Sequence, residues 1–180
     1  MNSTNLTNRG RFSVTKLGNW ESNDQFWLQS ADELIEGLKR NQKFIPIEFL
    51  YDDLGSELFD KMVESEEYYL PQKEKSILKK FGPHIVELTK KCDIYELGSG
   101  SARKTSILLR CYRDAGYSFT FYPIDINQSI MEKGAGELNN ILPDIAINCI
   151  VGTFEQALTE MKAQKSKRMV LFIGSSISQL

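Results

Sequence analysis

The stretch that decides the fold is DIYELGSGS, residues 93–101. Its first five residues form a short apolar run typical of a buried strand, and helical periodicity begins near Ala102 or Arg103. Glycines at positions 98 and 100 allow the backbone to turn sharply and to approach a ligand closely. The helix start beyond them offers N–H groups and a positive dipole end to a carboxylate or phosphate. The segment predicts a nucleotide-type cradle, with a plain strand-to-helix turn as the alternative.

The alternation of strand-like and helix-like segments continues through the rest of the chain. Segments with helical periodicity separate four short apolar runs, which are residues 93–97, 119–124, 145–151 and 169–174. Strand, helix and strand repeated in this way predict parallel β-α-β units with right-handed crossovers. We therefore expect an α/β fold with a doubly wound, mainly parallel sheet over residues 92–180.

Two segments precede this region. Residues 24–91 carry apolar side chains at helical spacing, so we expect an N-terminal helical segment there. Residues 1–23 are rich in Asn, Ser and Thr, and we expect a mobile polar arm. A doubly wound nucleotide-binding sheet usually has more than four strands. We therefore expect residues 92–180 to be the truncated start of such a sheet in a longer protein, with a compact four-stranded protein as the alternative.

Composition argues against several classes of function. With 22 Lys+Arg and 24 Asp+Glu, the formal charge of −2 leaves no basic excess for nucleic-acid binding. Apolar runs are too short to span a membrane and the first residues are polar, so we expect no membrane partner and a cytoplasmic location. Cys92, Cys111 and Cys149 are typical of reduced core thiols, and with His84 as the single histidine no metal site is expected. The composition does not indicate an oligomeric state.

Details of the glycine loop favour one class of cofactor. The third glycine of a dinucleotide fingerprint would fall at Arg103, which disfavours NAD and FAD. An acidic residue before a single G-x-G, here Glu96, is instead typical of sites for S-adenosyl-L-methionine, where the loop backbone meets the methionyl portion. Gly98 and Gly100 are therefore predicted to bind this cofactor.

Residues after the first three strands would complete such a site. Asp125 could accept hydrogen bonds from both ribose hydroxyls, with a turn or helix-cap role as the alternative. Thr153 and Phe154 could hold an adenine ring, or could simply pack. Arg103 and Lys104 lie in the first helical turn, where the helix dipole disfavours cations unless an anion such as the methionyl carboxylate is bound. Solvated surface bases are the alternative.

Several of these motifs stand in register with a known family. They are FLYD (residues 49–52), GSELF (55–59), EYY (67–69), ELGSGS (96–101), KT (104–105), PID (123–125) and GSSI (174–177). From about residue 45 to residue 180 the chain resembles the histidine-specific S-adenosylmethionine-dependent methyltransferases, typified by the enzyme that trimethylates the α-amine of histidine to hercynine in ergothioneine biosynthesis. The resemblance implies a Rossmann-like domain and a second domain built from N-terminal helices and a later insertion, with the substrate between them.

The resemblance also implies roles on the cofactor side. Gly98, Lys104 and Asp125 match cofactor-binding positions, and Thr153 and Phe154 match the pair near the adenine. Bacterial histidine enzymes of the family carry an acidic residue in place of Thr153. Fungal relatives, including one that acts on a prenylated tryptophan, have Thr there.

On the substrate side, Tyr51 and Tyr68 match family tyrosines, which would orient the amine. Judged from the residues alone, the alternative is that these rings simply pack in the core or on the surface. Gln179 falls where the family places an Asn that grips the polar backbone groups of the amino acid. The chain departs here, because Ser178-Gln179 replaces Gly-Asn and moves the amide by roughly 1.5 Å.

The function implied is an N-methyltransferase that uses S-adenosylmethionine and acts on the α-amine of an amino acid, with histidine the first expectation. The alternatives are the same chemistry on another amine, such as a tryptophan derivative, and a cofactor-binding module without catalysis. We nominate no catalytic acid or base, because the sulfonium charge disappears as the new bond forms. The 180-residue chain is expected to be inactive alone, because the rest of the substrate pocket lies beyond it.

Overall fold

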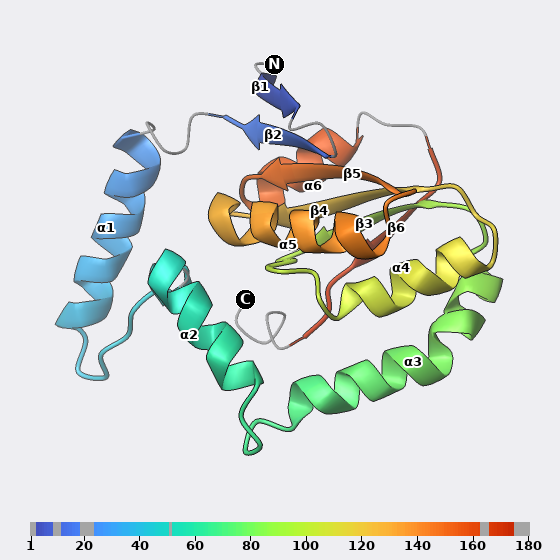
Figure 1. The fold of residues 1–180 in the computed structure, drawn as a ribbon. Helices are drawn as coiled ribbons and strands as arrows, with labels where there is room; N and C mark the ends of the chain where they lie inside the picture. The colour runs from blue at the N-terminus through green and yellow to red at the C-terminus, as the bar shows by residue number, and fades with distance from the viewer. Residues whose placement is uncertain (1–2, 9–11, 19–23, 51, 163–165, 175–180) are drawn as a thin grey trace.

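The computed structural model describes residues 3–8, 12–18, 24–50, 52–162 and 166–174, which form an α/β fold around one sheet (Figure 1). The strands are β1 (Ser3–Asn8), β2 (Ser13–Leu17), β3 (Asp93–Leu97), β4 (Thr120–Asp125), β5 (Ala146–Val151) and β6 (Arg168–Leu171). Their order in the sheet is β1-β2-β5-β4-β3-β6, and all neighbours run parallel except β1 and β2. Each apolar run that the sequence predicted as a strand overlaps one of the strands β3 to β6.

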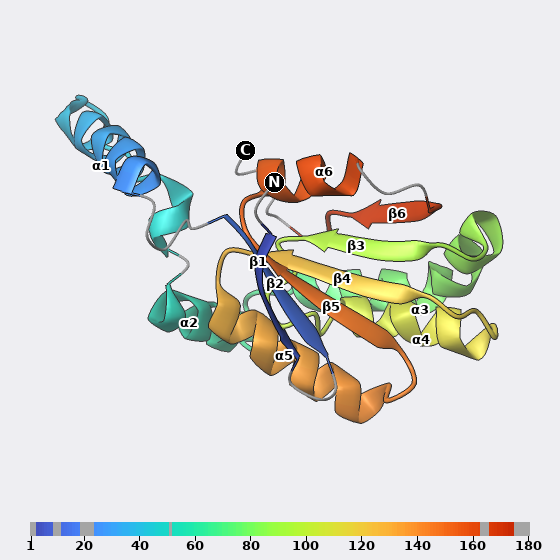
Figure 2. The same cartoon turned by 90° about the horizontal axis from the view of Figure 1, so that it is seen from above.

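Helices cover both faces of the sheet, as Figure 2 shows from above. They are α1 (Asp24–Lys39), α2 (Asp53–Val63), α3 (Leu70–Thr89), α4 (Thr105–Asp114), α5 (Gln128–Ile141) and α6 (Phe154–Lys162), with a short 3-10 helix η1 (Ile47–Leu50). The connections through α4 and α5 step from β3 to β5 in one direction, and the connection through α6 returns past β3. Right-handed crossovers therefore place α4 and α5 on one face and α6 on the other. Helix α3 packs against α4, and α1 lies apart from the sheet in both views.

The two faces of β3 explain why both are covered. Ile94 and Tyr95 are adjacent, point to opposite faces and are both fully buried. Ile94 belongs to the larger core, which also contains Leu109 of α4 and Phe121 of β4 and lies on the face that α4 and α5 cover. Tyr95 belongs to a smaller core that includes residues of α6. The doubly wound parallel arrangement predicted from the apolar runs is confirmed.

The N-terminal segment differs from the mobile arm expected for residues 1–23. Strands β1 and β2 lie within it, and β2 runs parallel to β5 along the edge that the predicted sheet would leave open. Val14 and Leu17 bury their side chains, and the Ser13 hydroxyl donates a hydrogen bond of 2.6 Å to Oδ1 of Asn148. The open parallel edge of β5 thus pairs with a short, weakly apolar strand that has no independent signal in the sequence.

The helices α1, α2 and α3 fall within the range expected to be helical, residues 24–91. In the part of the chain that the structure describes, no helix has the length and apolarity needed to cross a membrane.

Candidate cofactor and substrate site

The glycine loop lies at the carboxyl end of β3, between β4 and β6 on either side of that strand. Here the strand order reverses, which is where open α/β sheets bind ligands. Gly98, Gly100 and Ala102 have φ angles of 65°, 49° and 53°. The Ser99 N–H donates to the Ile124 carbonyl at 3.1 Å, and the Ala102 N–H donates to the Ser99 carbonyl at 2.8 Å. A left-handed alanine is costly outside a constrained loop, so the fold holds this turn in a defined shape.

Helix α5 presses directly on the loop. A Cβ atom at Gly134 would lie 2.6 Å from the carbonyl oxygen of Ser101, closer than real Cβ contacts allow. A glycine at position 134 is therefore what lets α5 support the loop from behind.

Asp125 fastens the loop to the next strand. Its Oδ2 accepts a hydrogen bond of 2.8 Å from the Gly100 N–H, and its Oδ1 accepts one of 3.0 Å from the Asn127 N–H. The helix cap is a different residue, because the Asn127 side chain accepts from the Ile130 N–H at the start of α5. Burial raises the pKa of Asp125, and these N–H donors partly offset that effect. A carboxylate has about four lone-pair sites, so these bonds leave acceptor capacity for a diol.

Glu96 places a second carboxyl group under the loop. Its Oε1 accepts a hydrogen bond from the Thr105 hydroxyl at the start of α4. Burial raises the pKa of Glu96 to about 8, the nearby charge of Asp125 adds to this rise, and Thr105 and Lys104 oppose it. Among the described residues, Oε2 of Glu96 and Oγ of Ser99 are buried without a hydrogen-bond partner. Two unsatisfied polar atoms beside a glycine loop fit a polar ligand group bound there.

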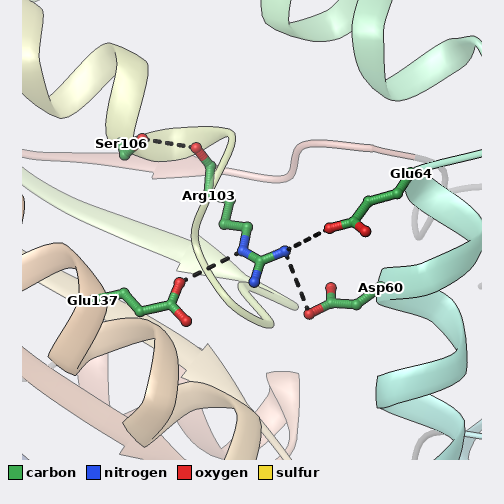
Figure 3. A network of polar contacts seen from close by, with 5 residues as sticks. All are labelled: Asp60, Glu64, Arg103, Ser106 and Glu137. Carbon is green, nitrogen blue, oxygen red and sulfur yellow. Dashed lines mark hydrogen bonds and ion pairs between the residues drawn. The ribbon is translucent and has the colours of Figure 1, made fainter.

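The two cations predicted in the first helical turn lie just before α4, and the chain's own carboxylates offset them. The Nζ atom of Lys104 lies 2.7 Å from Oε2 of Glu74 on α3. The Arg103 guanidinium faces Asp60, Glu64 and Glu137, as Figure 3 shows. These partners were missed from the sequence, where the signal was that cations at a helix start need an anion nearby. A contact between Lys104 and a cofactor carboxylate stays a prediction.

The predicted adenine corner lies at the carboxyl end of β5. The Gly152 N–H donates to the Asp125 carbonyl at 3.1 Å, which brings this corner beside the end of β4. Thr153 and Gln156 form a reciprocal cap on α6, in which each side chain accepts from the other's N–H. The Phe154 ring packs edge-on against Phe172, with ring centroids 5.4 Å apart. The structure thus uses both predicted residues locally, and their contact with an adenine stays a prediction.

The substrate side is described in part. Tyr51 and Gln179 lie outside the described residues, and Tyr68 is half-buried in the loop between α2 and α3. Helix α2, which lies between the two tyrosines in the sequence, is joined to α5. Its buried Ser56 hydroxyl accepts a hydrogen bond of 3.1 Å from the Asn127 side chain. This contact places α2 close to the Asp125 turn.

Comparison with known proteins gives consistent matches. Residues 30–180 match the sequence model of a family described as histidine-specific, SAM-dependent methyltransferases. A histidine N-alpha-methyltransferase from Mycobacterium tuberculosis is 32% identical over 148 residues, covering 82% of this chain and 46% of that protein. Ergothioneine biosynthesis protein 1 of Schizosaccharomyces pombe is 34% identical, covering 83% of this chain and 20% of that protein.

A third relative has a different kind of name. N-methyltransferase dtpB of Aspergillus flavus is 34% identical over 157 residues, covering 82% of this chain and 44% of that protein. The chain thus spans less than half the length of each of these three relatives.

Proposed function

We propose that the protein transfers a methyl group to the α-amine of an amino acid, because the chain belongs to the histidine-specific, S-adenosylmethionine-dependent methyltransferase family. The observation that carries the proposal is the loop of residues 98–100 at the point where the strand order reverses, which Asp125 fastens to the end of β4. Beside it lie the unpartnered Oε2 of Glu96 and Oγ of Ser99. We expect these atoms to receive polar groups of a bound ligand.

Different residues around the loop would bind different parts of the cofactor. The backbone at Gly98 and Gly100 would meet the methionyl portion, and Lys104 its carboxylate. Asp125 would hold the ribose diol, with Thr153 and Phe154 beside the adenine. The cofactor supplies a methyl group activated by a sulfonium. The chain supplies the orientation of the bound cofactor.

Transfer requires position more than proton chemistry. The amine must present its neutral nitrogen in line with the methyl group, at about 3 Å and with water excluded. We assign that orientation to Tyr51 and Tyr68, and the grip on the amino acid's backbone groups to Gln179. Because the leaving sulfide needs no proton, no residue of this chain is assigned as a general acid or base.

Histidine is the first candidate substrate, because the mycobacterial relatives carry that substrate in their names. A different amine is the second candidate, and a specific observation favours it. The fungal dtpB, named only as an N-methyltransferase, matches this chain at 34% identity, and Gln179 replaces the Asn expected from the family. A module that binds the cofactor without catalysis is the third.

The cytoplasm is the compartment we propose for this chemistry. The cysteines Cys92, Cys111 and Cys149 are free, and Cys92 and Cys149 are buried in the core, as expected in a reducing environment.

The decisive experiment uses the protein at its natural full length. Methyl transfer from labelled S-adenosylmethionine is measured against a panel of amino acids that includes histidine, tryptophan and their derivatives. Cofactor binding is measured separately by calorimetry. Transfer to histidine supports the first candidate, transfer to another amine supports the second, and tight binding without any transfer supports the third. The absence of cofactor binding would contradict all three.

A further inference from the structure

Arg103 connects the glycine loop to two other helices. It lies just before α4, and its guanidinium nitrogens approach carboxylate oxygens of Asp60 at 3.8 Å, Glu64 at 3.6 Å and Glu137 at 3.5 Å (Figure 3). Asp60 is on α2, Glu64 ends that helix, and Glu137 is on α5. One side chain therefore draws α2 and α5 together over the residues that follow the loop.

Helix α2 is held in place only in part by apolar burial. Three of its large apolar side chains, Leu54, Leu58 and Met62, are 64%, 54% and 45% exposed, while Phe59 and Val63 are half-buried. Its buried residue is Ser56, which bonds to Asn127. With much of its apolar area still in water, the position of α2 depends in part on polar contacts.

The electrostatics of the three partners favour the contact with Arg103. Asp60 and Glu64 lie near the carboxyl end of α2, where the helix dipole disfavours anions. Arg103 lies next to the amino end of α4, where the dipole disfavours cations. Contact between the guanidinium and these carboxylates offsets both unfavourable interactions with the helix dipoles. Single exposed ion pairs contribute little, but three carboxylates around one guanidinium form a network.

The position of α2 bears directly on the substrate side. In the sequence α2 stands between Tyr51 and Tyr68 and ends five residues before Tyr68, so a shift of α2 moves the Tyr68 segment relative to the loop. We propose that Arg103 is a positioning residue, which docks α2 against the cofactor loop and thereby sets the site for the amine. The proposal rests on the proposed function and adds a residue whose part in it is indirect.

A direct contact between Arg103 and the cofactor's carboxylate is the competing explanation. Three carboxylates already surround the guanidinium, which disfavours an approaching anion. The two roles predict different measurements, because a direct contact changes cofactor affinity and a positioning role changes the affinity for the amine.

The test compares Arg103→Gln and Arg103→Lys in the full-length protein, with Arg113→Gln as the matched control. Arg113 is a half-buried arginine in the last turn of α4 that pairs with its neighbour Asp114. For Arg103→Gln we expect KM for the amine to rise about tenfold, with the Kd for S-adenosylhomocysteine within about twofold of wild type. Arg103→Lys keeps the positive charge but lacks the planar guanidinium with its several N–H donors, so KM for the amine should rise about threefold. The control should match wild type.

A second readout does not depend on activity. Hydrogen exchange of the α2 amides should be about fivefold faster or more in Arg103→Gln, while that of β3 and β4 stays unchanged. KM of the wild type should also rise with ionic strength, and KM of Arg103→Gln should not. If Arg103→Gln does not fold, the double variant Asp60→Asn, Glu64→Gln removes the two contacts between α2 and Arg103 and leaves the one with Glu137. The same results are expected, because the contacts with α2 are the ones that dock this helix.

Two results would overturn the proposal. One is unchanged KM together with unchanged α2 exchange, and the other is a loss of S-adenosylhomocysteine affinity that equals the rise in KM. Failure of the proposed function would look different, because the wild type itself would then methylate no amine. In that case the exchange of α2 still decides whether Arg103 docks this helix.

Discussion

The ammonium nitrogen of Lys104 lies 2.7 Å from Oε2 of Glu74, so the lysine predicted to meet the cofactor's carboxylate already has a carboxylate partner. The segment after β6 reaches the same point, since a Cβ atom at Gly174 would lie 2.8 Å from the lysine nitrogen. Gly174 has a φ of 102°, a conformation that also favours glycine. Helix α3, the start of α4 and the residues after β6 therefore meet at one ion pair.

Glu74→Gln should tighten binding of S-adenosylhomocysteine by about threefold to tenfold, because the ligand carboxylate would no longer compete for Lys104. The measurement is calorimetric titration, with Glu87→Gln as the control, because Glu87 is an exposed glutamate of the same helix that faces His84. Weaker binding in Glu74→Gln would mean that Glu74 aims the lysine instead of competing for it.

Asp125→Ala should weaken S-adenosylmethionine binding by about 1 to 3 kcal/mol, through lost hydrogen bonds to the diol and a less restrained loop. The loop is affected because the carboxylate accepts from Gly100 and Asn127. Asp125→Asn keeps one acceptor oxygen and should lose less. Equal cofactor affinity in all three proteins would remove Asp125 from the site.

Gly134→Ala should destabilise the fold by about 1 to 3 kcal/mol and weaken cofactor binding, because its methyl group would push the Ser101 backbone. Gly136→Ala is the matched control on the same helix. Nothing lies within 4 Å of a Cβ atom there, so it should be neutral or stabilise by up to about 1 kcal/mol. Chemical denaturation measures both effects, and equal stabilities of the two variants would contradict the close approach of α5 to the loop.

Glu96→Gln should reduce the loss of stability with rising pH. The folded-state pKa of Glu96 is raised from 4.5 to about 8, so its stabilising contribution is complete below the lower value and is lost as pH rises towards the higher one. In that window the unfolded chain ionises while the buried carboxyl keeps its proton, which costs at most about 1.4 kcal/mol per pH unit. Glutamine does not titrate, so the difference in unfolding free energy between variant and wild type should grow from pH 5 to pH 8. Parallel curves would show that Glu96 is already ionised when buried.

Much of the architecture could be predicted because short local stretches of sequence determine it. The run of residues 93–97 became β3, and the glycines at 98 and 100 adopt the positive φ angles that the turn required. Strand β2 could not be predicted in the same way. Its burial comes from pairing with β5, whose paired residues are more than 130 positions away in the chain.

The site shows the same division. The positions of Gly98, Gly100 and Asp125 at neighbouring strand ends follow from a parallel sheet. The bond between Asp125 and Gly100 and the pairing of Lys104 with Glu74 join residues 25 and 30 positions apart, and no spacing rule connects them. The helical spacing of apolar residues indicated a helix in the region of α3 but did not indicate which of its glutamates faces the loop.

A crystal structure of the full-length protein with S-adenosylhomocysteine would show whether the loop after β3 and the carboxylate of Asp125 hold the cofactor. We expect the amino-acid end of the ligand against the backbone of residues 98–100, its carboxylate beside Lys104 and both ribose hydroxyls on Asp125. A ligand bound away from the carboxyl ends of β3 and β4 would show that this loop is not the cofactor site.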